Sequence, residues 1–341
     1  MTYHFRNLVF EGGGVKGAAY LGAMQVLEEK GILPDIERVG GTSVGAINAI
    51  LVALGFSNSE QRDILFKLNF KNFLDDSWGV FRDVTRVMKK FGWYKGDRFQ
   101  EWISSLVKEK LGNSDATFQN LKEANKPDLY VYGTNLSTHF GEVFSIEHSP
   151  TMRIADAVRI SMSLPLFFAA VRNTRNDVFV DGGCLNNYPI KLFDREKYIH
   201  SDNQGKMALK TDYYGKENER FLKEHPGRSP YVYNRETLGF RLDSKEEIAA
   251  FRYGEIQHEK IDYFFEYVRS LVKTILDCQS NIHLHSDDWH RTIYIDTLGV
   301  STTDFDLSND VKRELEKSGR KGTELYFEWF DNPTSQPVNR P

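Results

Sequence analysis

Three glycine-marked turns of the sequence carry residues that could do chemistry, and each turn follows a short apolar run. The first is GGGVKG, residues 12–17, in which glycine backbones expose N–H groups at the expected start of a helix. N–H groups in that position bind an anion, either a phosphate or the oxyanion of an acyl-transfer intermediate. The same residues fit the G-x-G-x-x-G dinucleotide pattern, with Asp35 or Glu37 about 20 residues further on. Taken alone, this loop leaves both interpretations open.

The second turn is GTSVG, residues 41–45, which lies between an expected strand and an expected helix. A Gly-x-Ser-x-Gly sequence in that context is typical of a nucleophile elbow, a strained turn that lifts the serine hydroxyl out of the sheet. The flanking glycines are needed because the sharp turn brings neighbouring backbones close. The alternative is that Ser43 only caps the following helix.

The third turn is Asp181-Gly182-Gly183, which places a carboxylate at the end of an expected strand at residues 178–180. Asp-Gly also favours an ordinary tight turn without any function. The functional interpretation gains support from the other two turns. All three would lie at one edge of a parallel sheet, where such folds bind ligands.

The elements that must position these turns are predicted by the pattern of apolar residues. Strands at residues 7–10 and 36–39, joined through a helix from residue 17, indicate a parallel βαβ unit with a right-handed crossover. We therefore expect an α/β fold, with a mostly parallel central sheet flanked by helices. Further expected elements are a largely helical stretch at 62–119, strands at 128–133, 141–146 and 291–296, and helices at 46–54, 154–162 and 262–277.

Length and composition restrict the class of protein. The 341 residues carry a net charge of -4, which argues against a general nucleic-acid binder, and the two cysteines make no disulfide framework. No apolar stretch reaches the roughly 20 residues that a membrane-spanning helix needs, and the N-terminus has no signal-peptide pattern. We expect a cytoplasmic or peripheral membrane protein; export without a cleavable signal stays open.

With these motifs in this order, the chain resembles the bacterial patatin-like phospholipases. That family carries a glycine-rich oxyanion loop, a Gly-x-Ser-x-Gly elbow and an Asp-Gly-Gly motif. The stretches AVRISMSLP (157–165), NNYP (186–189), ETLGFRL (236–242) and TLGV (297–300) are similar to further family landmarks. The resemblance implies one patatin-like catalytic domain over residues 1–330, with a variable surface excursion at 195–230. Residues 331–341, which contain three prolines, are expected to form a disordered tail.

The resemblance also implies a mechanism, a Ser–Asp dyad that uses no histidine, metal or organic cofactor. Ser43 would attack the acyl ester of a phospholipid or lysophospholipid, Asp181 would act as the base, and an acyl-Ser43 intermediate would be hydrolysed by water. The oxyanion hole would comprise the amides of Gly12, Gly13 and Gly14, with Lys16 nearby. The glycines of the elbow and of the base motif would be Gly41, Gly45, Gly182 and Gly183. An ordinary aspartate is a weak base for a serine hydroxyl, so burial must raise its pKa.

Several alternatives stay open at this point. A histidine triad would draw on His200, His225, His258, His283, His285 or His290, although too few strands precede Ser43 for the usual α/β-hydrolase sheet. An acyltransferase, a dinucleotide-binding oxidoreductase and an inactive lipid-binding scaffold are the rival functions, and the sequence does not tell whether an activator is needed. The run from His283 to His290 is interpreted as a surface loop rather than a metal site. Cys184 is interpreted as a buried filler rather than a nucleophile.

A ring-rich segment within residues 60–120 is a candidate helical lid. Residues 62–98 contain nine Lys or Arg and five Asp or Glu, a local excess of four positive charges in an acidic protein. Basic amphipathic helices with aromatic residues bind lipid surfaces. The segment is therefore predicted either to dock on anionic membranes or to bury its rings as an ordinary capping element. The residues that suggest docking are Phe66, Phe70, Phe73, Trp78, Phe81, Phe91, Trp93 and Tyr94, with Lys89, Lys90 and Lys95.

Overall fold

A mixed sheet forms the centre of the chain in this computed structural model. The structure describes residues 3–73, 91–243, 260–263, 266–267, 270–271, 274–275, 287–302, 304–332 and 334. Within them the strand order is β12-β11-β1-β2-β4-β8-β7, and β5 pairs with β4 beside that path. The strands are β1 (Asn7–Phe10), β2 (Arg38–Thr42), β4 (Asp128–Asn135), β5 (Phe140–Phe144), β7 (Val171–Arg172), β8 (Val178–Asp181), β11 (Thr237–Asp243) and β12 (Thr292–Asp296).

The five strands from β12 to β4 in this order are parallel, whereas β5, β7 and β8 join by antiparallel pairing. The predicted α/β class with a mostly parallel sheet is therefore confirmed. Asp181 was expected on a parallel strand, and that detail is wrong: β8 runs antiparallel to β4. A strand three to four residues long carries no sequence signal for the direction in which its partner runs.

The reversal of β8 brings two strand ends together. β2 pairs with β4 up to Thr42 opposite Tyr132, and β8 pairs with β4 from Asp181 opposite Gly133. The two strands thus run toward each other along β4, and their carboxyl ends meet. This arrangement, rather than a shared edge of a parallel sheet, places the second and third glycine-marked turns side by side.

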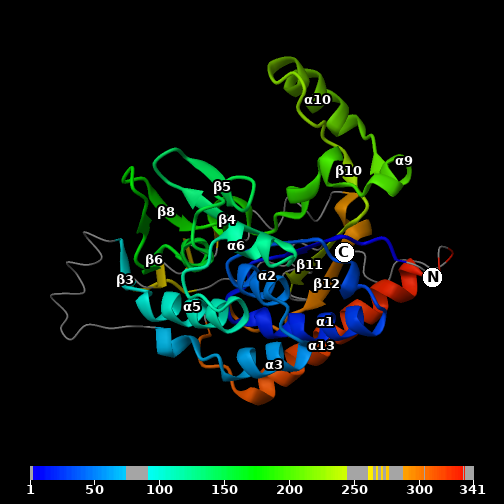
Figure 1. The fold of residues 1–341 in the computed structure, drawn as a ribbon. Helices are drawn as coiled ribbons and strands as arrows, with labels where there is room; N and C mark the ends of the chain where they lie inside the picture. Colours follow the sequence, from blue (N-terminus) through cyan, green and yellow to red (C-terminus); the bar gives the residue numbers. More distant parts are fainter. Residues whose placement is uncertain are drawn as a thin grey trace.

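Helices cover one face of the sheet. Successive side chains of a strand point to opposite faces, so every second residue packs under these helices. In β1, Leu8 and Phe10 join the large core under the helices, while Val9 points to the opposite face. Figure 1 shows α1, α2, α3, α5 and α13 together on that side of the sheet. Their bounds are α1 (Ala19–Glu29), α2 (Val44–Leu54), α3 (Asn58–Lys67), α5 (Asp97–Leu111) and α13 (Asn309–Phe330), and a further helix, α7 (Ile154–Ser161), packs against α5 and β4.

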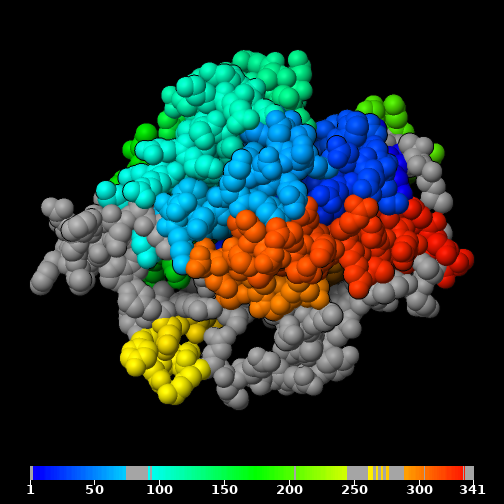
Figure 2. Space-filling view, turned by 90° about the horizontal axis from the view of Figure 1, so that it is seen from below, coloured from blue at the N-terminus to red at the C-terminus, as the bar shows by residue number. Residues whose placement is uncertain are grey.

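The longest of these helices, α13, lies across the outside of this layer. Figure 2 shows it next to the surface of the first helices of the chain. The opposite face of the sheet is covered by a smaller cluster that gathers around the 3-10 helix η4 (Ile190–Phe193). That cluster comprises Val9, Tyr130, Tyr188, Ile190, Phe193 and Tyr198.

The polar excursion expected at 195–230 is a projecting arm (Figure 1). It contains a regular helix, α10 (Asp212–Glu224), with the short elements η5 (Glu196–Tyr198), η6 (Ser201–Asn203), α9 (Gln204–Met207), β9 (Ala208–Leu209) and β10 (Tyr233–Asn234). Its root is anchored by buried groups: Arg291 forms ion pairs with Asp194 and Asp288, and the Tyr214 hydroxyl donates to Asp194. The arm therefore has a fixed base although most of α10 is exposed.

The expected helical stretch at 62–119 is wrong at one point. After α3 and the 3-10 helix η3 (Phe70–Phe73), the chain forms a short strand, β3 (Gly92–Tyr94), before α5 and α6 (Phe118–Glu123). β3 pairs in parallel with β6 (Leu166–Phe168). Phe70 and Phe73 are buried, as the capping interpretation of the ring-rich segment predicts, whereas Trp78, Phe81, Lys89 and Lys90 lie outside the described residues.

Two other expectations fall largely on residues that the structure does not describe. Of the helix expected at 262–277, the structure describes eight residues, 262–263, 266–267, 270–271 and 274–275, and the last six of these are helical. Of the tail at 331–341, the described residues are 331, 332 and 334. Within the described part of the chain, no helix combines the length and apolarity that crossing a bilayer requires.

Candidate active site

The turn at Ser43 is strained and crowded. Ser43 has φ 55° and ψ -127°, a left-handed conformation that is costly for a non-glycine residue. A Cβ on Gly41 would lie 2.4 Å from the Gly45 carbonyl, and one on Gly45 would lie 2.4 Å from the Phe10 carbonyl oxygen. Backbone atoms cannot give way as a flexible side chain does, so both glycines are required. The strand–turn–helix geometry of a nucleophile elbow is present, as the sequence predicts.

Ser43 does not act as a side-chain cap, although it is the N-cap residue of α2. Its side chain makes no capping hydrogen bond, and its hydroxyl instead lies 3.6 Å from the Met162 sulfur. The strained backbone is held from outside the turn. The Ser43 N–H donates to the Ser161 hydroxyl at 2.9 Å, and that hydroxyl donates to the Tyr132 carbonyl at 2.6 Å. Fully buried Ser161 thus ties α7 and β4 to the elbow.

Asp181 is buried beside this turn. Its Oδ1 accepts a hydrogen bond of 2.7 Å from the Gly183 N–H, and its own N–H donates to the Ser163 carbonyl at 2.9 Å. Burial raises the pKa of Asp181 to about 7, while the Gly183 N–H and the Ser43 hydroxyl act to lower it. The raised pKa is the change that a carboxylate needs to serve as a base near neutral pH.

The second oxygen of Asp181, Oδ2, has no hydrogen-bond partner among the described residues. The Ser43 hydroxyl is close enough to lower the pKa of Asp181, and it also contacts the Met162 sulfur at 3.6 Å. An unpaired buried oxygen costs free energy, and such an atom in a native structure needs an explanation. An oxygen of this kind, unpaired among the described residues, is available to accept a proton from a bound group.

The glycine-rich loop reaches Ser43 through Gly12. A Cβ there would lie 3.1 Å from the Ser43 Cβ and 2.3 Å from Oδ1 of Asn187, so only glycine fits. Asn187 holds Gly12 on both sides: its carbonyl accepts the Gly12 N–H at 2.9 Å, and its Nδ2 donates to the Gly12 carbonyl at 3.1 Å. The Gly12 N–H is therefore occupied. The N–H groups of Gly13 and Gly14 donate to no group in the described part of the chain.

Charged groups lie beneath this loop. Glu11 is buried, and its carboxylate accepts a hydrogen bond of 2.7 Å from the Leu242 N–H in β11. Burial raises the pKa of Glu11 to about 8, although Arg241 acts to lower it. Lys16 is buried as well, in the 3-10 helix η1 (Gly14–Ala18). The loop is thus fastened to β11 on one side and to Asn187 on the other.

Ser161 and Asn187 are the two side chains of this site to which sequence reasoning assigned no role. Both stand in stretches that the family resemblance singles out, 157–165 and 186–189. Ser161 ends α7 between the apolar residues Ile160 and Met162, and a fully buried hydroxyl there requires a hydrogen-bond partner. That partner is the Ser43 backbone, which is close only after the chain has folded.

The remaining candidates form no site among the described residues. Three of the six histidines considered for a triad fall outside those residues: His258, His283 and His285. The other three have neighbours away from Ser43: His200 lies near Glu37 and Asp202, His225 against Phe221, and His290 against Trp289. No group of metal-binding side chains occurs in the described ranges, and Asp288 instead pairs with Arg291. Burial raises the pKa of Cys184 to about 12, which keeps it protonated and unreactive at neutral pH.

Comparison with known proteins places the chain in a family. The family model described as patatin-like phospholipase matches residues 8–194, which contain all three glycine-marked turns. An uncharacterized protein of Bacillus subtilis, YqhO, is 28% identical over 94% of this chain and 97% of its own length. An uncharacterized protein of Acanthamoeba polyphaga mimivirus, R571, is 33% identical over 55% of this chain and 61% of its own.

Two further matches agree with that assignment. A protein named a probable lipid hydrolase, 463L of Invertebrate iridescent virus 6, is 25% identical over 60% of this chain and 67% of its own. The crystal structure of VipD from Legionella pneumophila has the same fold, with a TM-score of 0.60 and 19% identity, over 95% of this chain and 67% of that one. The chain therefore belongs to the patatin-like phospholipase family of lipid hydrolases.

Proposed function

We propose that this protein hydrolyses fatty-acyl esters of phospholipids or lysophospholipids through a Ser43–Asp181 dyad. The observation that carries the proposal is the meeting of two strand ends on β4, which sets a strained serine beside a buried carboxyl whose pKa is raised to about 7. The family supplies the lipid substrate class.

The first half-reaction forms an acyl-enzyme. Asp181 removes the proton of the Ser43 hydroxyl through its unpaired Oδ2, and the serine oxygen bonds to the ester carbonyl carbon. The tetrahedral intermediate then loses the alcohol, which takes the proton from Asp181. In the second half, Asp181 removes a proton from water, and the hydroxide bonds to the acyl carbonyl carbon. The bond from that carbon to the Ser43 oxygen then breaks, Ser43 takes the proton back from Asp181, and the fatty acid is released.

The negative charge of each tetrahedral intermediate needs hydrogen-bond donors. The Gly13 and Gly14 N–H groups are the donors that we propose, because the Gly12 N–H is already bound to Asn187. The role of Gly12 is then to let the loop approach Ser43 closely. Lys16 and the start of α2 add positive potential nearby.

The test is hydrolysis of a panel of phospholipids and lysophospholipids by the wild type, Ser43→Ala and Asp181→Asn, with and without cell extract in case an activator is needed. We expect fatty acid release by the wild type and a fall of at least about 1,000-fold in each variant, with both still folded. Fatty acid release by Ser43→Ala at the wild-type rate would contradict the proposal. Acyl transfer to an added alcohol in place of water would identify a transferase that uses the same acyl-enzyme.

A further inference from the structure

Glu11 follows β1 directly and stands before the glycine-rich loop. It is 2% exposed, and its backbone is held on both sides: its N–H donates to the Phe240 carbonyl at 3.1 Å, and its carbonyl accepts the Tyr20 hydroxyl at 2.7 Å. The chain therefore enters the loop from a fixed point, with the Glu11 side chain in the protein interior.

The Glu11 carboxyl bridges two other segments of the chain. Its Oε2 accepts the Leu242 N–H at 2.7 Å, and its Oε1 accepts a longer hydrogen bond of 3.4 Å from Nδ2 of Asn187. The same Nδ2 donates to the Gly12 carbonyl at 3.1 Å. One carboxyl thus joins β11, the loop and the segment that follows Asp181.

Leu242 carries this restraint to Gly13. A Cβ on Gly13 would lie 2.6 Å from Cδ1 of Leu242, so the leucine side chain packs directly on the Gly13 backbone. The residue whose N–H is bound by Glu11 is therefore the residue that packs against one of the two proposed oxyanion donors. A glycine backbone has more conformational freedom than any other, so its direction must be set by such contacts.

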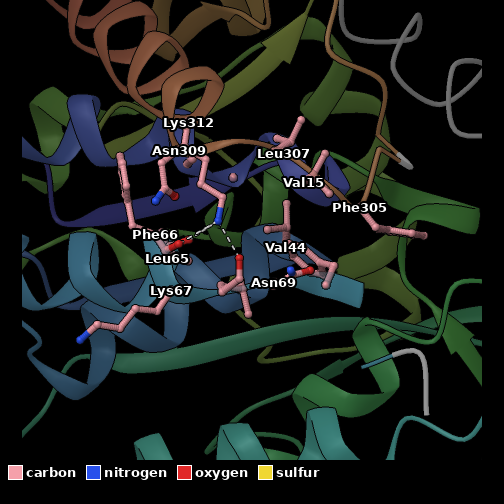
Figure 3. Close-up of a pocket in the computed structure, with 14 residues that line it drawn as sticks. Val15, Val44, Leu65, Phe66, Lys67, Asn69, Phe305, Leu307, Asn309 and Lys312 are labelled. Carbon is pink, nitrogen blue, oxygen red and sulfur yellow. Dashed lines mark hydrogen bonds between the residues drawn. The ribbon is translucent and has the colours of Figure 1, made fainter. Parts of the chain in front are cut away.

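The other end of the loop is held in a different way. The Val15 N–H donates to the Thr302 carbonyl at 3.3 Å, and the Val15 side chain lines a pocket together with Val44 (Figure 3). One backbone hydrogen bond and packing thus fix the loop at the start of η1, and Glu11 fixes it where it leaves the sheet. The two proposed donors lie between these points.

The carboxyl acts through hydrogen bonds more than through charge. Burial raises the pKa of Glu11 to about 8, and Asp243 adds to the rise, while Arg241 and Lys16 act to lower it. At pH 7 the group is therefore mostly uncharged, and Arg241 forms its own ion pair with Asp243 at 2.8 Å. A glutamine has nearly the same shape, is uncharged and still accepts a hydrogen bond, so it can take over this role.

We infer that Glu11 is a positioning residue for the proposed oxyanion hole. Its carboxyl holds Leu242 against Gly13 and Asn187 against Gly12, and in this way it fixes the direction of the N–H groups that receive the oxyanion. The inference rests on the proposed function and adds to it the group that orients the donors. Oxyanion stabilisation depends on donors that are oriented before the reaction, and loss of one donor costs about 100- to 1,000-fold in kcat.

The test compares Glu11→Leu and Glu11→Gln with the wild type on a soluble p-nitrophenyl ester. Glu11→Leu accepts no hydrogen bond, and we expect kcat to fall about 100-fold while KM changes less than about threefold. Glu11→Gln still accepts the Leu242 N–H, so its kcat should fall less than about tenfold. Glu11→Asp, whose side chain is one methylene shorter, should lie between the two.

Asn7→Leu is the matched control, at the end of β1 that lies away from the loop. Asn7 is also fully buried and also bonds to β11, through the Thr237 hydroxyl at 3.3 Å. Like Glu11→Leu, this variant should lower the midpoint of urea unfolding, but it should leave kcat unchanged. If Glu11 only supported the fold, the two variants would have the same kinetics.

A second measurement reports on the oxyanion hole itself. When an alkyl trifluoromethyl ketone inhibits the enzyme, its carbonyl carbon bonds to the Ser43 oxygen, its carbonyl oxygen takes the negative charge, and Asp181 takes the serine proton. The corresponding secondary alcohol has the same chain but no carbonyl. We expect Glu11→Leu to weaken inhibition by the ketone at least about tenfold and to leave inhibition by the alcohol unchanged, with Asn7→Leu affecting neither.

A kcat for folded Glu11→Leu equal to that of the wild type or of Asn7→Leu would overturn the inference, as would equal weakening of ketone and alcohol. If Glu11→Leu does not fold, Glu11→Asp decides by the same criteria. If the wild type hydrolyses no ester, the proposed function fails, and hydrogen exchange of the Gly12 N–H then tests the positioning separately. Exchange at least about tenfold faster in the Glu11 variant than in Asn7→Leu supports it, and equal exchange overturns it.

Discussion

The turns that carry Ser43 and Asp181 are similar in sequence, since each follows a short strand and contains glycines, but they are built in different ways. The Ser43 turn holds its residue in a left-handed conformation, needs two glycines against neighbouring backbones, and is fastened by the side chain of Ser161. The Asp181 turn fastens its carboxylate within itself, through the Gly183 N–H two residues on. Backbone strain is thus concentrated at the proposed nucleophile, Ser43, and desolvation at the proposed base, Asp181.

This contrast has a physical reason. A nucleophile must present its oxygen at one point, and a strained turn supported by packing provides that precision. A base must have a suitable pKa, and that depends on burial more than on backbone shape. Substitutions in the two turns should therefore have different effects. Changes at the Ser43 turn should lower stability and kcat, whereas changes at Asp181 should also alter how stability depends on pH.

The largest effect is expected from Gly45→Ala. The added Cβ would lie 2.4 Å from the Phe10 carbonyl oxygen and 2.6 Å from that of Glu11, so α2 must move away from β1. We expect a loss of about 3 kcal/mol in the free energy of unfolding, measured by urea denaturation, together with loss of esterase activity.

The matched control is Gly215→Ala in α10, where the added Cβ meets nothing within 4 Å. A helix-interior glycine replaced in open space should stabilise the protein by about 0.5–1 kcal/mol. Equal free energies of unfolding for Gly45→Ala and the wild type would show that the elbow is not crowded as described.

An intermediate effect is expected from Ser161→Ala, which removes the acceptor of the Ser43 N–H and the donor to the Tyr132 carbonyl. Each buried group left unpaired costs about 1–3 kcal/mol. With the turn less well held, kcat should fall about 100-fold while KM changes little.

Ser163→Ala is the control for this variant, because that side chain bonds to Arg159 and not to the elbow. Steady-state kinetics on a soluble ester separate kcat from KM in both. A rise in KM at constant kcat in Ser161→Ala would mean that the serine supports substrate binding instead of the nucleophile.

A third effect, which depends on pH, concerns the stability that Asp181 contributes. Because the folded pKa, about 7, is above the ordinary value of 3.8, the folded state holds this proton more tightly than the unfolded state. Stability from this group is therefore full below about pH 4 and is lost as pH rises through 7. Asp181→Asn, which cannot ionise, should be more stable than the wild type at pH 8, by on the order of 1–4 kcal/mol, and the difference should shrink at pH 5.

Urea denaturation of the two proteins at both pH values measures this difference. Glu11, whose pKa is also raised, is present in both proteins and so cancels. A stability difference that does not change between pH 5 and pH 8 would show that Asp181 is not a carboxyl whose burial raises its pKa.

The sequence predicted those parts of the site that depend on local pattern. The glycines at 41 and 45, the strand before Ser43 and the helix after it are all short-range signals, and the elbow geometry follows from them. The α/β class was likewise predictable from the first βαβ unit. The family motifs named Asp181, but its strand direction was predicted wrongly.

What the sequence could not predict depends on long-range pairing. β8 meets β2 end to end because both pair with β4, about 90 and 50 residues away along the chain, and a four-residue strand has no preference of its own for either direction. The role of Ser161 depends on the same packing, as does the occupation of the Gly12 N–H by Asn187. The strand β3 was missed because its residues look like the aromatic helices around them.

The central claim, that Ser43 is the nucleophile and Asp181 its base, is tested most directly by the pH dependence of covalent labelling. The wild type and Asp181→Asn are treated with a fluorophosphonate probe between pH 5 and 9, and the labelled residue is located by peptide mass spectrometry. We predict labelling of the wild type at Ser43, at a rate that rises with an apparent pKa near 7, and slow labelling of Asp181→Asn without that rise. Labelling at another residue, or the same pH profile in both proteins, would contradict the account.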